Sequence, residues 1–189
     1  NATGRLGDPY RKKFLEEREL VVMLVIEASL SLQFGSGART KREGLFELAA
    51  LVMLLAALNR DSISVVHVQP GGHRIYDRVR GRSAVFHAAT KLMDCPAPDL
   101  TDTRPVETPW DVLVTAAPNH SMMVVLGDFP PREVPREWKR VIQRFVPVAF
   151  RVEDPWEREL PGKKPLTVYD PTTSRVVVMD PRSTVHRHA

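Results

Sequence analysis

Residues 19–31 read ELVVMLVIEASLS, and this stretch decides the fold. Its first part, residues 19–26, is a nearly continuous aliphatic and β-branched run. Such a run predicts a strand that is buried on both faces of a mainly parallel sheet. It ends in EASLS, where small and polar residues predict a turn. Apolar runs at residues 62–69, 122–126 and 146–152 predict three more strands of the same sheet.

Helical patterns lie between these strands. Residues 40–43, TKRE, have the spacing of a capping box and predict a helix that runs to about residue 59. This helix is apolar almost all round, so we expect it to be packed on several sides, with little of it in water. Residues 83–93 and 135–145 also have helical spacing. Alternating strands and helices predict an α/β fold, doubly wound and Rossmann-like, with right-handed crossovers.

The length of 189 residues favours one domain with short extensions. We expect residues 1–18 to be a lead-in segment left from a truncated upstream region, because the chain starts without Met and without a signal pattern. Residues 19–161 form the predicted α/β domain. Residues 162–189 form an extension and tail, in which β-like runs at 166–169 and 175–179 predict a C-terminal β-hairpin.

Composition limits the classes of function. The net charge of +4 does not require a nucleic-acid partner. The single cysteine excludes an intramolecular disulfide, a four-cysteine zinc site and CxxC redox chemistry, and it favours a reducing, cytoplasmic location. The longest apolar stretch, residues 45–58, is too short to span a membrane.

Oxygen-bearing side chains gather where two predicted strands end. Glu27, Ser29 and Ser31 follow the first strand, and Asp128 follows the strand at 122–126. Ligands bind at the carboxyl ends of strands in this architecture, and hard oxygen ligands suit Mg²⁺ or Ca²⁺. The alternative is structural: the two serines only cap the turn, and Glu27 is a solvated strand end.

Several motifs resemble a known bacterial family. They are ATGR at residues 2–5, KKFLEEREL at 12–20, the serine turn, Gly-Arg at 81–82, Gly-Asp-Phe at 127–129 and DPWERELP at 154–161. Together they resemble the family called domain of unknown function fifty-eight. This family is a branch of the von Willebrand factor A-like fold, which carries a metal-ion-dependent adhesion site written Asp-x-Ser-x-Ser. The resemblance covers almost the whole chain.

The resemblance implies a non-enzymatic domain that binds other proteins. Family members resemble partners of MoxR-type AAA+ ATPases that act in assembly or maturation, and many carry amino-terminal membrane helices that would anchor the full-length protein. It also implies a Mg²⁺ or Ca²⁺ site at Glu27, Ser29, Ser31, Asp128 and a threonine. Thr101, Thr103 and Thr108 are all candidates, and spacing favours Thr103 slightly. In such sites the partner supplies an acidic side chain as the last metal ligand.

This sequence departs from the family at Glu27, which stands where the adhesion motif has Asp. The side chain is one methylene longer, and it would crowd the octahedral shell that Mg²⁺ demands. We therefore expect a degenerate site, in which replacing Glu27 with Asp tightens Mg²⁺ binding. A metal-free structural module is the first alternative. A metal-dependent phosphohydrolase is the second. The absence of a Gly-x-Ser-x-Gly nucleophile elbow disfavours a Ser-His-Asp hydrolase, and the absence of a P-loop pattern disfavours phosphate binding at residues 35–37.

Overall fold

A five-stranded sheet forms the centre of the computed structural model, which describes residues 20–162, 164–170, 173 and 175–182. The strands are β1 (Val21–Glu27), β2 (Ser62–Gln69), β3 (Gly72–Val79), β4 (Ser121–Gly127) and β5 (Phe145–Arg151). Their order is β3-β2-β1-β4-β5, and all neighbours are parallel except the antiparallel pair β2 and β3. The four strands predicted from sequence therefore lie in one mainly parallel sheet, as expected.

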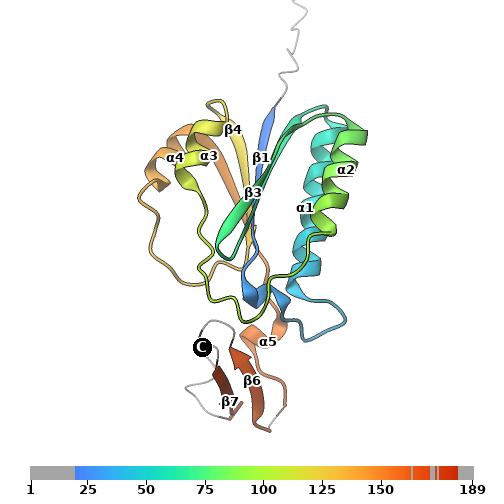
Figure 1. Cartoon of the computed structure of the whole chain (residues 1–189). Coiled ribbons are helices and arrows are strands. Elements are labelled where there is room, and N and C mark those ends of the chain that lie inside the picture. Colours follow the sequence, from blue (N-terminus) through green and yellow to red (C-terminus); the bar gives the residue numbers. More distant parts are fainter. Residues whose placement is uncertain (1–19, 163, 171–172, 174, 183–189) are drawn as a thin grey trace, which may run out of the picture.

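Helices cover both faces of this sheet (Figure 1). One face carries α1 (Lys41–Leu58) and α2 (Arg82–Met93), which pack against each other. The opposite face carries α3 (Trp110–Ala116) and α4 (Trp138–Arg144). Alternate residues of β1 serve the two layers: Val22, Leu24 and Ile26 join the core beneath α1, whereas Met23 and Val25 join the core beneath α3. This two-sided burial explains why β1 is an unbroken apolar run.

The long helix α1 begins as predicted but is more exposed than predicted. Thr40 is its N-cap, and both halves of the capping box with Glu43 are formed. The inner face, including Phe46 and Met53, is buried against the sheet. The outer face exposes Leu51, Leu54, Leu55 and Leu58, each by about half. The expectation of little exposure to water was wrong, because a three-layer fold offers a helix only one sheet to pack on.

Short elements complete the described chain. The 3-10 helix η1 (Leu30–Gln33) follows the first strand, and α5 (Pro155–Arg158) follows the last strand of the sheet. The predicted C-terminal hairpin is confirmed as β6 (Leu166–Asp170) paired antiparallel with β7 (Arg175–Met179). The lead-in segment expected at residues 1–18 lies outside the described residues. Of the helices described, none is long and apolar enough to cross a membrane.

Candidate functional site

The predicted serine turn and Asp128 do come together. Strands β1 and β4 are parallel neighbours, so the residues that follow them emerge at the same edge of the sheet. The Ser29 hydroxyl donates to Asp128 Oδ1 at 2.9 Å, and the Ser31 hydroxyl donates to Asp128 Oδ2. The two serine oxygens are 2.9 Å apart. These three residues form one hydrogen-bonded group at the carboxyl ends of the strands.

Glu27 is buried beside this group and has partners of its own. Arg132 Nη2 lies 2.9 Å from each carboxylate oxygen of Glu27, and the Thr108 hydroxyl donates to Glu27 Oε1. Thr103, which sequence spacing favoured, is exposed, whereas Thr108 is buried. Thr108 lies two residues before the buried Trp110 that starts α3. This end of the loop is therefore held against the core of the domain.

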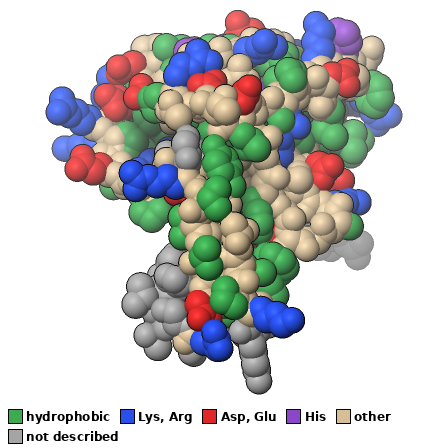
Figure 2. Space-filling model, turned by 60° about the horizontal axis from the view of Figure 1, so that its bottom comes forward, with side chains coloured by type: hydrophobic (Ala, Val, Ile, Leu, Met, Phe, Trp, Pro, Cys, Tyr) green, Lys and Arg blue, Asp and Glu red, His purple; other side chains and the backbone are tan. Residues whose placement is uncertain are grey.

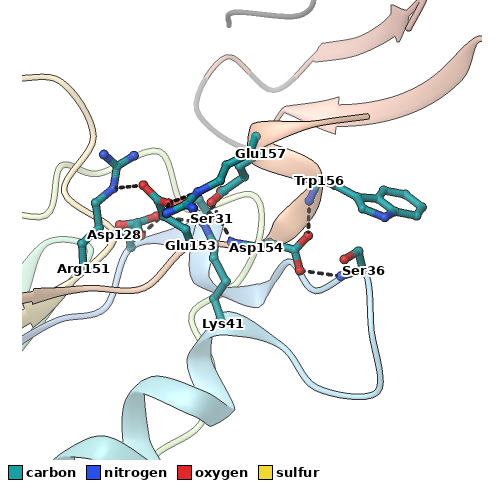
Figure 3. A network of polar contacts seen from close by, with 11 residues as sticks. Ser31, Ser36, Lys41, Asp128, Arg151, Glu153, Asp154, Trp156 and Glu157 are labelled. Carbon is teal, nitrogen blue, oxygen red and sulfur yellow. Dashed lines mark hydrogen bonds and ion pairs between the residues drawn. The ribbon is translucent and has the colours of Figure 1, made fainter. Parts of the chain in front are cut away.

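A buried lysine completes the group (Figure 3). The Lys41 side chain is only 3% exposed, and its Nζ lies 3.3 Å from Asp128 Oδ2. The same ammonium forms an ion pair with Glu157 Oε1. Lys41 is the first residue of α1, so the Thr40 capping box fixes where its side chain begins. Lys41 could not be recognised from the sequence, where it resembles an ordinary polar residue of a first helical turn.

The DPWERELP segment positions Glu157. Asp154 is the N-cap of α5, Pro155 occupies the first turn, and Glu157 closes a second capping box by accepting from the Asp154 backbone N–H at 3.0 Å. Proline at the first helical position and a carboxylate three residues after the cap both favour such a start. The motif therefore has a local structural role, and it also holds Glu157 against Lys41.

Asp154 ties this short helix to the loop before α1. Its carboxylate accepts the Ser36 backbone N–H at 2.8 Å and the Trp156 backbone N–H at 2.9 Å. Burial alone would raise the pKa of Asp154, but the hydrogen bonds from Ser36 and Trp156, with the charge of Lys41, outweigh it and leave this pKa below its usual value. The Asp154 carboxylate is therefore held in its charged form.

Glu153 lies in the same network, which Figure 3 shows between Arg151 and α5. Arg158 Nη2 lies 2.5 Å from Glu153 Oε2, and Arg151 Nε lies 3.1 Å from Glu153 Oε1. The hydrogen bond from Arg158 is the main reason why the pKa of Glu153 is lowered. Carboxylates and cations thus alternate along this edge of the domain.

An apolar groove of about 560 Å³ opens next to the network. Ser31 and Glu157 stand on its polar side. Its apolar wall comes from η1, α5 and the β6–β7 hairpin and includes Leu30, Phe34, Trp156, Leu160, Val168 and Met179. The rings of Phe34 and Trp156 are tilted against each other with centroids 6.3 Å apart. The groove therefore combines aromatic side chains with charged groups at one margin.

A second hollow, of about 530 Å³, is lined by residues of β4, β5 and α4 and also by Phe129 and Arg132. Phe129 directly follows Asp128 and has a φ of 45°. A bulky residue rarely adopts this left-handed conformation, and strained residues of this kind are frequent at functional sites. The strained backbone position is therefore the residue directly after Asp128.

The chemistry of the donors does not match a metal shell. The Asp128 and Glu27 carboxylates already face the cations Lys41 and Arg132. Both serine hydroxyls donate to a carboxylate, whereas a nucleophilic serine is usually activated by an adjacent general base such as histidine.

Fold and site together define a three-layer α/β domain with a polar network at the carboxyl ends of its parallel strands. A family of sequences described as "Protein of unknown function DUF58" matches residues 1–189, so the chain belongs to that family. No curated protein matches the chain.

Two solved structures share the fold. One is the conserved hypothetical protein BatB from Bacteroides thetaiotaomicron, with a TM-score of 0.58 and 12% identity over 89% of this chain and 84% of that one. The other is an aerotolerance-related membrane protein from Bacteroides fragilis NCTC 9343 carrying multiple mutations to serine. It has a TM-score of 0.52 and 14% identity over 86% of this chain and 82% of that one. At these identities the likeness concerns the fold alone.

Proposed function

We propose that this chain is a non-enzymatic, von Willebrand factor A-like domain that binds another protein at the carboxyl ends of its strands. The observation that carries the proposal is the apolar groove between η1, α5 and the β6–β7 hairpin. Hydrophobic side chains gather along this end of the molecule, from the body of the domain toward the hairpin (Figure 2). An apolar, aromatic centre with a charged margin is the usual composition of a protein-binding surface.

The polar network supports a binding role over catalysis. The carboxylates of Glu27 and Asp128 each contact a cation and a hydroxyl group of the chain. General acid and base catalysts instead need a proton-transfer group held within reach of a substrate. The network fixes the serine turn and α5 relative to each other, because Asp128 contacts the turn and Lys41 links Asp128 to Glu157. A rigid rim of this kind presents the groove in one conformation.

The partner implied by the family resemblance is a MoxR-type AAA+ ATPase. We therefore propose such an ATPase, purified from the same source, as the first probe. Binding to the immobilised domain would be measured by biolayer interferometry. Trp156→Ala should weaken binding by about 30-fold, as expected when a central aromatic anchor worth roughly 2 kcal/mol is removed.

Val134→Ala is the matched control, since Val134 is a well-exposed apolar residue outside the groove. It should leave the affinity unchanged. Equal affinity of the Trp156→Ala variant and the original chain would contradict the assignment of the groove. Failure of the original chain to bind would contradict this ATPase as the partner.

A further inference from the structure

We propose that Lys41 is the resident cation of the strand-end site, and that its ammonium group takes the position at Asp128 that a divalent metal would hold in an adhesion site of this kind. Binding of a partner would then need no metal. The consequence for the partner rests on the proposed function, whereas the role of Lys41 can be tested on the domain alone.

Burial of the Lys41 ammonium group supports this role. Lys41 is 3% exposed and pairs with Asp128 Oδ2 at 3.3 Å and with Glu157. An unpaired charge in such a place is strongly unfavourable, so a buried lysine requires its carboxylate partners. The two partners come from segments far apart in the chain, after β4 and within α5. The fold thus gathers carboxylates around an ammonium group.

The position of Lys41 in its own helix also supports this role. The amino-terminal end of a helix carries a partial positive charge, which disfavours a lysine in the first turn. Lys41 is the first residue of α1. Local helix stability does not explain a lysine there. The carboxylates of Asp128 and Glu157 do explain it. Their negative charges offset both the ammonium charge of Lys41 and the partial positive charge at the start of α1.

A divalent ion does not fit beside the cations Lys41 and Arg132. An ammonium nitrogen has three donors and no acceptor, so it cannot serve as a metal ligand. Mg²⁺ next to Asp128 would have to displace Lys41 or share a buried space with a like charge. Arg132 places a second cation on Glu27, 2.9 Å from each carboxylate oxygen. Each carboxylate expected to hold a metal is thus already paired with a cation of the chain.

This arrangement changes the chemistry expected of the partner. In a metal-dependent adhesion site an acidic side chain of the partner completes the metal shell. Here the charge of Lys41 is already shared by Asp128 and Glu157. The partner's affinity would come from apolar side chains in the adjacent groove, and a chelator would not weaken it.

The test is a calorimetric Mg²⁺ titration of the original domain, Lys41→Met and Lys41→Arg, repeated with Ca²⁺. Methionine keeps the length and apolar stem of lysine without its charge. We expect no saturable binding of either ion to the original domain at millimolar concentrations. Lys41→Met should gain saturable binding, at least tenfold tighter than any residual binding to the original domain, because Asp128, Ser29 and Ser31 are then free to act as ligands. Lys41→Arg keeps the positive charge and should show no saturable binding of either ion.

Saturable Mg²⁺ or Ca²⁺ binding to the original domain would overturn the proposal. So would a folded Lys41→Met variant that binds neither ion. If Lys41→Met does not fold, Lys41→Gln replaces it, with the same expected gain of binding and the same contradicting outcome. No partner is present in these titrations, so their failure is distinct from a failure of the groove to bind a protein.

Discussion

At the scale of single residues, the ion pairs of this domain differ sharply in burial. Lys41 and Asp128 are 3% and 9% exposed at the side chain, whereas Arg39 and Glu47 are 67% and 52% exposed. Removing one member of a buried pair leaves an uncompensated charge, whereas exposed pairs are screened by solvent. The two pairs therefore offer a matched comparison.

We expect Lys41→Ala to lower the free energy of unfolding by about 3 kcal/mol. Arg39→Ala should lower it by less than about 1 kcal/mol. Urea denaturation followed by circular dichroism measures both. Similar losses in the two variants would show that Lys41 is not the buried link that joins Asp128 to Glu157.

His67 gives a pH-dependent prediction. Its side chain is buried on β2, with Nδ1 3.7 Å from the Cys95 sulfur. Burial, and then the positive charges of Arg42 and Arg74, lower the pKa of His67 from 6.5 to about 4. The folded state therefore keeps His67 neutral, while the unfolded state takes up a proton below pH 6.5. Stability is highest above that pH and falls as the pH drops toward 4.

The expected loss from this histidine is roughly 1.4 kcal/mol per pH unit below pH 6.5, reaching about 3 kcal/mol near pH 4. Urea midpoints between pH 7 and about pH 5 measure it. In the His67→Gln variant the slope over this range should be much smaller. An equal slope in both proteins would contradict the assignment to His67.

The candidate site was only partly predictable at this scale. Ser29, Ser31 and Asp128 could be placed together, because the residues that follow neighbouring parallel strands meet at one edge. The cations were missed because their contacts depend on packing between distant segments: Lys41 lies 87 residues from Asp128, and Arg132 lies 105 residues from Glu27. The available signal was a lysine in a first helical turn, where the helix dipole disfavours it.

At the scale of elements, α1 shows what apolar composition can and cannot predict. The capping box placed its start correctly. The nearly uniform apolar sequence did not reveal which side faces the sheet, because that requires the position of the helix in the layers. Met53 and Leu54 are neighbours in sequence, but Met53 is fully buried and Leu54 is half exposed.

These neighbours predict different costs for the same kind of truncation. Met53→Ala should destabilise the domain by about 2 to 5 kcal/mol, because it opens a cavity beneath the helix. Leu54→Ala should lower the free energy of unfolding by about 1 kcal/mol or less. About half of the Leu54 side chain is already exposed to water in the folded protein, so its truncation removes less buried apolar area. Thermal or urea denaturation distinguishes the two. A larger loss at Leu54 would mean that the outer face of α1 is covered in solution.

At the scale of the whole molecule, the order of patterns along the chain was enough to predict the layers. Apolar runs at residues 62–69, 122–126 and 146–152 became β2, β4 and β5, each close to its predicted limits. The pairing of β6 with β7 followed from two β-like runs joined by a turn. The groove could not be predicted, because it forms only where the hairpin, α5 and the serine turn meet.

Two explanations of a degenerate metal site now make opposite predictions. If the length of Glu27 limits metal binding, Glu27→Asp should tighten Mg²⁺ binding. If Lys41 already serves as the cation, shortening Glu27 changes nothing, because Lys41 remains 3.3 Å from Asp128 Oδ2. The two explanations differ in which cation lies beside Asp128, a metal ion or the ammonium group of Lys41. That cation decides whether the domain binds its partner through a metal.

The most direct measurement is therefore a Mg²⁺ titration of Glu27→Asp and Lys41→Met side by side, under the same buffer and temperature. Our account predicts saturable binding in Lys41→Met and none in Glu27→Asp. Saturable Mg²⁺ binding to Glu27→Asp, together with no Mg²⁺ binding to a folded Lys41→Met variant, would contradict it.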